Sequence, residues 1–314
     1  MQVKRLGYIA MDVADLDSSV RFYQDVAHLN VSERRDKLVF LTGGREHHWL
    51  ILRQSNHSRF QRVAFEMNSE AELDAMAERL EQAGTKVTAG DDLANERVAR
   101  YVRFTDPDGL MVELFTGMVE LPGEPLYVHN IRLEKMLHAV FRVTDISRSY
   151  KFYHDLLGFK ASDWVEHHAV FLRCADLYHH SLALFGGARE AAFDHLCILV
   201  PTLDDLMRAR ANVIALGVPL RNDLLRHGPS GSIAFYLQDE PNRMTTEFCI
   251  EHGRILDHAH RPRILPAIPE TLDVWTPLGT GIRGAFKAPT RISPQSVPSY
   301  QEVLGIESLS EREV

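Results

Sequence analysis

The sequence has few cysteines and no long apolar run. Three cysteines occur among 314 residues, at 174, 197 and 249, and this odd, scattered set fits neither a disulfide framework nor a zinc site. No stretch of 18 apolar residues is present, so no membrane span and no membrane partner is expected. The first residues also lack the apolar core of a signal peptide. These features predict a cytoplasmic protein with reduced thiols.

The charge balance is acidic rather than basic. Lys and Arg number 35 against 43 Asp and Glu, for a net charge of −8, which argues against nucleic acid as a partner because phosphate binding needs clustered cations. With 45% hydrophobic and 25% charged residues, the chain is globular and long enough for two domains. The 16 histidines are the one compositional oddity.

A long internal repeat organises the chain. The segment "YIAMDVADLDSSVRFYQDVAHL" from Tyr8 matches "HAVFRVTDISRSYKFYHDLLGF" from His138, 130 residues further on. Both carry an apolar run, then Asp, Ser, Arg, an aromatic pair and an amphipathic run. Residues 62–87 match 195–220 and residues 101–115 match 233–249 in the same order. A long internal period indicates a duplicated fold.

The repeated unit contains a strand, a helix and then short strands. Apolar runs at 38–43 and 168–174 predict strands. Residues 69–84 predict a helix with a Ser cap at its start and a Gly stop at its end, and "DPDG" at 106–109 predicts a turn between strands.

These elements predict an α+β fold of two domains, each made of two βαβββ modules. The first domain is expected at 1–122 and the second at 131–252, with a Pro- and Gly-containing connector near 120–127. Residues 253–314 are rich in proline and show no clear period. We expect them to form an extended tail that packs on the second domain.

Alignment of the two halves selects three strand positions. The aligned pairs are Tyr8 with His138, Arg62 with His195, and Glu113 with Glu247. Two imidazoles and one carboxylate on strands match the facial ligand set of a non-haem Fe(II) site, which leaves positions open for substrate and O2. The alternative is three unrelated polar residues at strand starts. Their joint selection favours metal ligands in the second domain and a metal-free first domain.

Residues 3–251, and most specifically 136–251, resemble the type I extradiol ring-cleaving dioxygenases of the vicinal oxygen chelate superfamily. The family signature stands here as "RHGPSGSIAFYLQDEPNRMTTEF" (226–248), with His227, Tyr236, Asp239 and Glu247. The resemblance implies the vicinal oxygen chelate fold and an Fe(II) cofactor, although Mn(II) fits the same ligands. It also implies cleavage of a catechol-type ring beside the diol with incorporation of O2, in the breakdown of aromatic compounds.

The resemblance also assigns roles to side chains that are not ligands. His180, in "HHSLAL", takes the place of the family's proton shuttle, and the alternative is a surface histidine. On an alternating strand, His179 is expected to point to the opposite face. His227 and Tyr236 match the pair that hydrogen-bonds the substrate beside the metal, although Tyr236 also fits a core aromatic. The histidines at 47, 48, 258 and 260 are expected to be structural.

The turn before Glu247 departs from the family. The family has Pro directly after the Asp and a Gly soon after, whereas Glu240 and Pro241 follow Asp239 here, without a Gly. One extra residue also separates Asp239 from Glu247, compared with the first half. Glu251, four residues further on, is the alternative ligand, but the match of "VELF" with "TEFC" favours Glu247.

Two other functions stay open beside the enzyme. A metal-free protein that binds an aromatic ligand would have no need of the three ligands, and a glyoxalase-like metal isomerase would use four. The expected partners are a catecholic substrate and O2, and a homo-oligomer is expected. The particular catechol is open: Trp275 and Arg283 of the tail are candidates for lining the pocket. An arginine there would suit a carboxylated ring, and an apolar pocket would suit a biphenyl-type diol.

Overall fold

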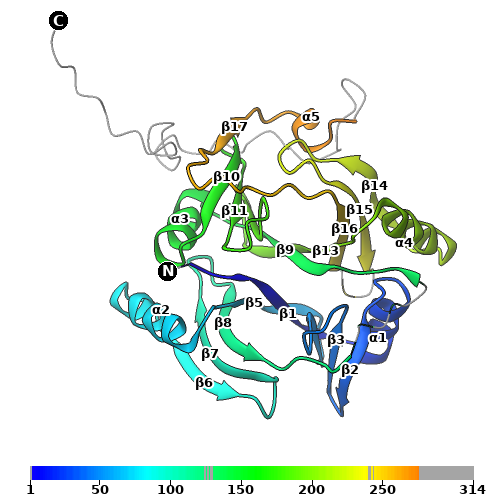
Figure 1. Cartoon of the computed structure of the whole chain (residues 1–314), viewed down its shortest axis with the longest axis horizontal. Helices are drawn as coiled ribbons and strands as arrows, with labels where there is room; N and C mark the ends of the chain where they lie inside the picture. The colour runs from blue at the N-terminus through cyan, green and yellow to red at the C-terminus, as the bar shows by residue number, and fades with distance from the viewer. Residues whose placement is uncertain are drawn as a thin grey trace, which may run out of the picture.

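The computed structural model describes residues 2–275, except 124, 126, 128–129, 240–241 and 243. Arg283, a candidate pocket residue, and most of the predicted tail therefore lie outside the described residues, as do Glu240 and Pro241. Figure 1 shows two halves, the N-terminal half in blue to green and the C-terminal half in green to orange.

The N-terminal half consists of two modules with the same element order. The first contains β1 (Arg5–Val13), α1 (Leu16–Asp25), β2 (Asn30–Arg35), β3 (Leu38–Thr42) and β4 (Leu50–Gln54). The second contains β5 (Arg59–Glu66), α2 (Glu70–Gln82), β6 (Thr88–Asp92), β7 (Val98–Thr105) and β8 (Met111–Met118). Their strands form one sheet of order β2-β3-β4-β1-β5-β8-β7-β6.

The C-terminal half repeats this order and adds a strand. Its first module contains β9 (Lys135–Arg142), α3 (Ile146–Lys151) with a following π turn (Phe152–Leu156), β10 (Lys160–Val165), β11 (Ala169–Arg173) and β12 (Leu182–Phe185). Its second contains β13 (Ala192–Leu199), α4 (Leu203–Ala215), β14 (Leu220–Arg226), β15 (Ile233–Asp239) and β16 (Met244–Ile250). The α+β prediction of two paired βαβββ modules is confirmed.

Local chemistry explains why the helices begin where they do. Asp15 caps α1 and Asp145 caps α3, each accepting a backbone N–H from the first turn. Ser69 and Thr202 do the same for α2 and α4. Each capping side chain accepts a hydrogen bond from a backbone N–H that the helix itself leaves unpaired. The Asp and the Ser or Thr that recur in the two halves of the sequence are therefore helix-capping residues.

Strand pairing verifies the alignment of the halves. Arg62 on β5 faces Ala10 on β1, and His195 on β13 faces Val140 on β9. Glu113 on β8 pairs beside Ala64, as Glu247 on β16 pairs beside Cys197. The residues matched by sequence therefore occupy equivalent places in the two sheets.

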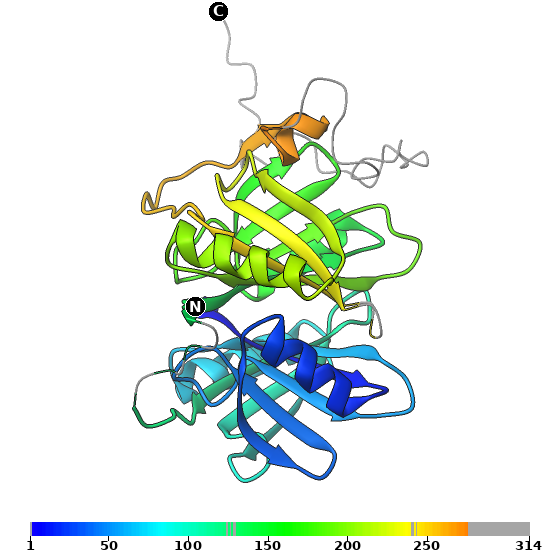
Figure 2. The same ribbon diagram turned by 90° about the vertical axis from the view of Figure 1, so that its right-hand side faces the viewer.

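The halves are joined by an aromatic core. In Figures 1 and 2 the strands β1 and β5 of one half face β9 and β13 of the other. Phe60 stacks on Phe193 with ring centroids 4.9 Å apart, and Phe65 meets Phe159 edge-on at 5.2 Å. Aromatic pairs of this kind add to the free energy of burying their surface. This contact packs the two halves against each other.

The described part of the tail lies on the C-terminal half. β17 (Arg263–Leu265) pairs in parallel with β10 and extends the sheet to nine strands. The short helix α5 (Pro269–Leu272) follows, and the Gly228 N–H donates to the Thr271 carbonyl. A Cβ on Gly228 would come within 2.6 Å of that carbonyl oxygen, so this close approach requires glycine.

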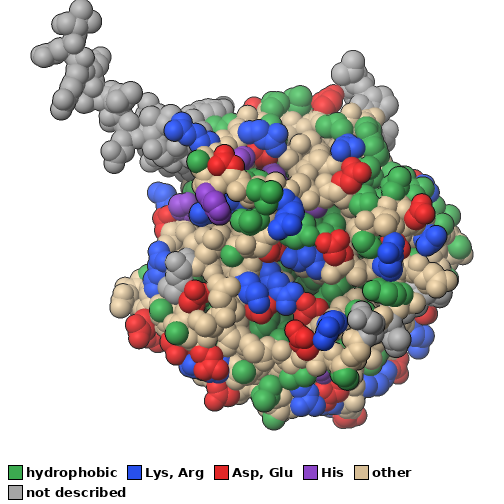
Figure 3. Space-filling view, viewed as in Figure 1, with side chains coloured by type: hydrophobic (Ala, Val, Ile, Leu, Met, Phe, Trp, Pro, Cys, Tyr) green, Lys and Arg blue, Asp and Glu red, His purple; other side chains and the backbone are tan. Residues whose placement is uncertain are grey.

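Within the described residues, no helix is both long and apolar enough to cross a membrane. On the face drawn in Figure 3, basic and acidic side chains are interspersed. The three cysteines are buried and unpaired by disulfides.

Candidate metal centre and substrate cavity

Three side chains from three neighbouring strands meet in the C-terminal half. His138 on β9 places Nε2 3.0 Å from Oε2 of Glu247 on β16. His195 on β13 places its own Nε2 3.2 Å from the same oxygen. All three residues are buried, with Glu247 only 1% exposed. The strand order β16-β13-β9 brings the histidines and the carboxylate together.

The hydrogen bonds determine which nitrogen of His195 faces Glu247. Its Nδ1–H donates to Asp194 over 2.7 Å, so the Nε2 lone pair is directed at the Glu247 carboxylate. Two imidazole lone pairs around one buried carboxylate repel it unless a cation or proton lies between them. A carboxylate behind a ligating histidine is the usual support of a metal site. The donor set therefore fits a divalent cation.

The pKa values reflect the same arrangement. Burial would raise the pKa of Glu247, but His138 and His195 hold it well below its ordinary value. Burial opposes protonation of His195, yet Asp194 and Glu247 raise its pKa to about 8. Without a bound cation, a proton on His195 balances the buried carboxylate.

Cys197 also lies at this centre, a position that the sequence did not suggest. Ligand atoms of His138, Cys197 and Glu247 lie within 4.8 Å of one another. The Cys197 thiol donates to Cys249 over 3.3 Å, and burial raises its pKa well above the ordinary value. A thiol that stays protonated is a poor ligand, so His195 completes the donor set better.

His227 and Tyr236 are joined beside Glu247. His227 Nδ1–H donates to the Leu272 carbonyl over 2.8 Å, so its Nε2 accepts a hydrogen bond from the Tyr236 hydroxyl at 2.7 Å. The same Nε2 lies 3.8 Å from Glu247 Oε1. Burial raises the pKa of Tyr236 well above its ordinary value. The phenol therefore stays protonated.

His180 is buried beside His138, and the expectation of opposite strand faces for its neighbour is wrong. His180 precedes β12 instead of lying on it, and both His179 and His180 are buried. Their Nδ1 atoms are 3.0 Å apart, and His179 Nε2 lies 2.8 Å from Asp163. Arg263 of β17 pairs in turn with Asp163 at 2.5 Å. Because the backbone at 179–180 is not extended in a strand, both rings turn to one side.

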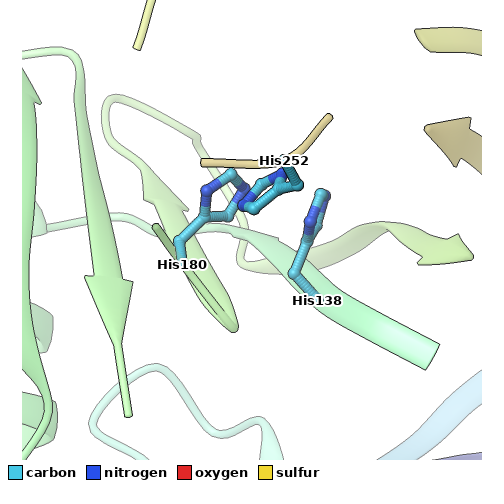
Figure 4. A group of neighbouring side chains, drawn as sticks. All are labelled: His138, His180 and His252. Atoms are coloured by element: carbon cyan, nitrogen blue, oxygen red, sulfur yellow. The ribbon is translucent and has the colours of Figure 1, made fainter. Parts of the chain in front are cut away.

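His252 is a buried histidine that sequence reasoning missed. Figure 4 shows it beside His180 and His138, with ring centroids 4.6 Å from the first and 5.6 Å from the second. Neither ring nitrogen of His252 has a hydrogen-bond partner among the described residues, nor does His138 Nδ1. Its only sequence signal is its place directly after the β16 segment.

The N-terminal half fills the equivalent position with charges of its own. Arg62 Nε donates to Glu113 over 3.0 Å, and Arg103 Nε donates to the same carboxylate over 2.5 Å. The Tyr8 hydroxyl also donates to Glu113, and Arg62 pairs with Glu96. A fixed guanidinium thus stands where the C-terminal half has an imidazole lone pair. This cation neutralises the carboxylate without a metal.

The histidine pair is also duplicated. His47 and His48 have Nδ1 atoms 3.2 Å apart, and His47 Nε2 lies 3.1 Å from Glu33, which pairs with Arg97. This chain of contacts copies the one from His180 to Arg263. These contacts lie in the N-terminal half, where Tyr8 and Arg62 replace the two candidate histidine ligands. This agrees with a structural role for His47 and His48.

A cavity of about 290 Å³ opens onto the C-terminal centre. Its lining includes His138, His195, Glu247, His180, His227 and Tyr236. Apolar walls come from Val140, Phe171 and Phe185, and Leu272 closes one side. Trp275, a candidate for the pocket lining, is 49% exposed and is not among the lining residues.

The two glutamates lie in different surroundings. Glu251 lies beyond the end of β16 at a positive φ of 58°, and it pairs with Arg226 at 3.4 Å. Its side chain is 55% exposed, whereas that of Glu247 is 1% exposed. Strand alternation no longer applies after Ile250, so Glu251 faces solvent.

Comparison with known proteins gives a consistent family. The family model described as Glyoxalase/Bleomycin resistance protein/Dioxygenase superfamily matches residues 5–114 and 135–248. The chain is 30% identical over 254 residues to biphenyl-2,3-diol 1,2-dioxygenase of Paraburkholderia xenovorans, covering 75% of this chain and 84% of that protein. It is 24% identical to the iron-dependent extradiol dioxygenase of Rhodococcus jostii, covering 82% and 93%. The Mn(II)-bound glyoxalase from Novosphingobium aromaticivorans superposes with a TM-score of 0.81 at 26% identity, covering 95% of each chain.

Proposed function

The chain belongs to the Glyoxalase/Bleomycin resistance protein/Dioxygenase superfamily, and we propose that it is an Fe(II)-dependent extradiol dioxygenase that cleaves a catechol-type ring beside the diol with O2. One observation carries the proposal: two imidazoles and a buried carboxylate converge at strand positions where the N-terminal half has a tyrosine, an arginine paired with the carboxylate, and the carboxylate itself. The names of the dioxygenase relatives support the same reaction class.

We assign the metal ligands to His138, His195 and Glu247. When bound, a divalent iron supplies a Lewis-acidic centre that brings the diol and O2 together. Asp194 holds the His195 ring in the tautomer that leaves Nε2 free for the ion. Mn(II) fits the same donors, and one relative and one structural neighbour carry manganese in their names.

His180 is placed to hold a proton from the diol. Burial and the neighbouring histidines lower its pKa well below the ordinary value, so the ring is neutral and has an unprotonated nitrogen before the diol binds. Its Nδ1 contacts His179, which leaves Nε2 as the atom that takes part. The His180 ring lies 4.2 Å from the His138 ring, measured between centroids, so the proton is taken beside the ligands.

The Tyr236–His227 pair orients the substrate oxygens on the other side of Glu247. The hydroxyl of Tyr236 is held by His227 Nε2 at 2.7 Å, and its oxygen remains available as an acceptor for the diol. Phe171 and Phe185 exclude water from the ring face. Together these groups bind the diol end in one orientation.

The remaining parts of the chain take supporting roles in this proposal. Residues 1–122 form a metal-free platform, residues 131–252 carry the reaction, and the described tail residues up to 275 pack on the second half. We further predict that the protein works in the cytoplasm as a homo-oligomer, which light scattering and cell fractionation would test.

The proposal is tested by iron content followed by turnover. The purified protein should bind one Fe(II) and convert catechol to a yellow ring-fission product under air. His138→Ala, His195→Ala and Glu247→Ala should each lose the iron and the product while the far-ultraviolet circular dichroism is kept. Glu251→Ala is the matched control and should keep both. Iron loss in Glu251→Ala together with retention in Glu247→Ala would reverse the ligand assignment.

The glyoxalase-like metal isomerase is kept as a second candidate because of the structural likeness to the Mn(II)-bound glyoxalase. That function is tested by adding a glutathione hemithioacetal to the metal-loaded protein. Isomerisation without ring cleavage would favour it. A protein that binds catechols but neither metal nor hemithioacetal would instead be a metal-free binding protein.

A further inference from the structure

Two arginines at the edge of the cavity have no role in the proposed function. Arg142 on β9 and Arg221 on β14 both line it. Arg142 lies four residues after the ligand His138, so alternation places both on the same face of β9. At about 3.3 Å per residue their Cα atoms are roughly 13 Å apart. The guanidinium therefore faces the part of a bound ring that is remote from the diol.

Arg221 approaches the same region from the neighbouring strands. Its Nη1 donates to the Thr245 hydroxyl over 3.0 Å, and Thr245 lies two residues before Glu247 on the same face of β16. Arg142 and Arg221 thus flank the cavity from opposite ends of the β14-β15-β16-β13-β9 segment of the sheet.

One carboxylate serves both arginines. Asp194 accepts from Arg142 Nε over 2.5 Å and lies 3.3 Å from Arg221 Nη1. The same carboxylate also holds His195 Nδ1 at 2.7 Å. With Glu247 assigned to the metal, two guanidinium charges face one carboxylate among the described lining residues. One positive charge at the cavity is left for an incoming anion.

The arginines also retain unused donors. Within the described part of the chain, Arg142 makes a side-chain hydrogen bond through Nε alone, and its side chain is 52% exposed. Among the described residues, the Arg221 side chain hydrogen-bonds only through Nη1, and it is 36% exposed. A guanidinium with two free N–H groups matches a planar carboxylate in a bidentate manner.

Resting on the proposed function, we propose that the substrate is a catechol bearing an anionic ring substituent, a carboxylate, held by Arg142 and Arg221 beside Asp194 at the edge of the cavity. The apolar walls at Val140, Phe171 and Phe185 then enclose the ring itself. A cavity of about 290 Å³ is at the small end for a ligand site, which favours a single substituted ring.

The experiment compares acids with amides of the same shape. Anaerobic calorimetry and steady-state turnover are measured with 3,4-dihydroxybenzoate against 3,4-dihydroxybenzamide, and with the 2,3-dihydroxy pair. At least one acid should bind and react about 10- to 100-fold better than its amide, the size expected for hydrogen bonds to a charged group. Added salt should weaken this preference.

Variants separate recognition from support of the metal site. Arg142→Met and Arg221→Met should each bring the acid-to-amide ratio towards one while the protein still binds Fe(II), because His195 Nδ1 keeps its own contact with Asp194. Arg132→Met is the matched control, since Arg132 is also 52% exposed and pairs with a buried Asp at 205, but it does not line the cavity. It should keep the parent ratio.

The outcomes distinguish this inference from the proposed function. Equal binding and turnover of acids and amides, or arginine variants that keep the parent acid-to-amide ratio, would overturn the anionic-substrate inference while ring cleavage stands. If no catechol is cleaved at all, the proposed function fails, and the anaerobic binding preference still decides whether the arginines select an anion.

Discussion

The matched carboxylates Glu113 and Glu247 should respond differently to the same substitution. Glu113→Gln removes the anion between two guanidiniums, Arg62 and Arg103, and leaves Glu96 as their remaining shared partner. Glu113 is 0% exposed, and breaking a buried pair costs about 3–5 kcal/mol. Because Glu96 keeps part of the compensation, we expect a loss near the lower end, about 3 kcal/mol, with or without metal.

Glu247→Gln should instead remove the part of the stability that depends on metal. Fe(II) at about 100 times its dissociation constant stabilises the parent by about 2.7 kcal/mol, and this increment requires the full donor set. Without metal the variant should differ less from the parent, because the protonated His195 loses one of two carboxylate partners and keeps Asp194.

Urea unfolding under anaerobic conditions measures both effects. Parent, Glu113→Gln and Glu247→Gln are each unfolded with a chelator and with excess Fe(II), and the difference between the two free energies is compared. The parent and Glu113→Gln should show the same metal increment, and Glu247→Gln none. A full increment in Glu247→Gln, or its loss in Glu113→Gln, would refute the assignment of metal to the C-terminal half.

Three further results are expected. His180→Gln should keep bound iron and catechol but lose about 10²–10⁴-fold in turnover, measured by anaerobic calorimetry and oxygen uptake, and a loss within a few-fold would contradict the proton-holding role. Replacement of both Tyr8 and Arg62 by His should yield no second bound metal by elemental analysis, because the supporting groups and cavity are missing; two metals per chain in the parent would oppose a metal-free first half. Burial raises the pKa of Asp106 from 3.8 to about 6, so the folded state binds this proton more tightly than the unfolded state. The resulting stabilisation of the fold is present below pH 4 and is lost as the pH rises through 6. At about 1.4 kcal/mol per pKa unit, Asp106→Asn should gain roughly 3 kcal/mol on the parent between about pH 4 and pH 7 in chemical unfolding, and parallel pH curves for the two proteins would contradict this.

The sequence alone was sufficient for the modules and for the candidate ligands. Helix caps such as Asp15 and Asp145, and the alternation of apolar strands, act over a few residues, so they can be read locally. The duplication then supplied an internal reference: Tyr8 and Arg62 marked His138 and His195 as the positions that differ. No comparable local signal exists for long-range pairing.

Only the tertiary structure decided which distant groups share the centre. His252 comes from the segment after β16, Asp163 from β10 and Arg263 from the tail. Their contacts with the pair at 179 and 180 depend on the sheet order, and the sequence spacing does not predict them. The opposite faces expected for His179 and His180 failed because alternation holds only within a strand, and these residues precede β12. The two arginines were likewise hidden, because Arg142 and Arg221 are 79 residues apart in sequence and meet only through Asp194. Side-chain position at a site depends on the sheet order and on the packing of the halves, which are properties of the whole fold.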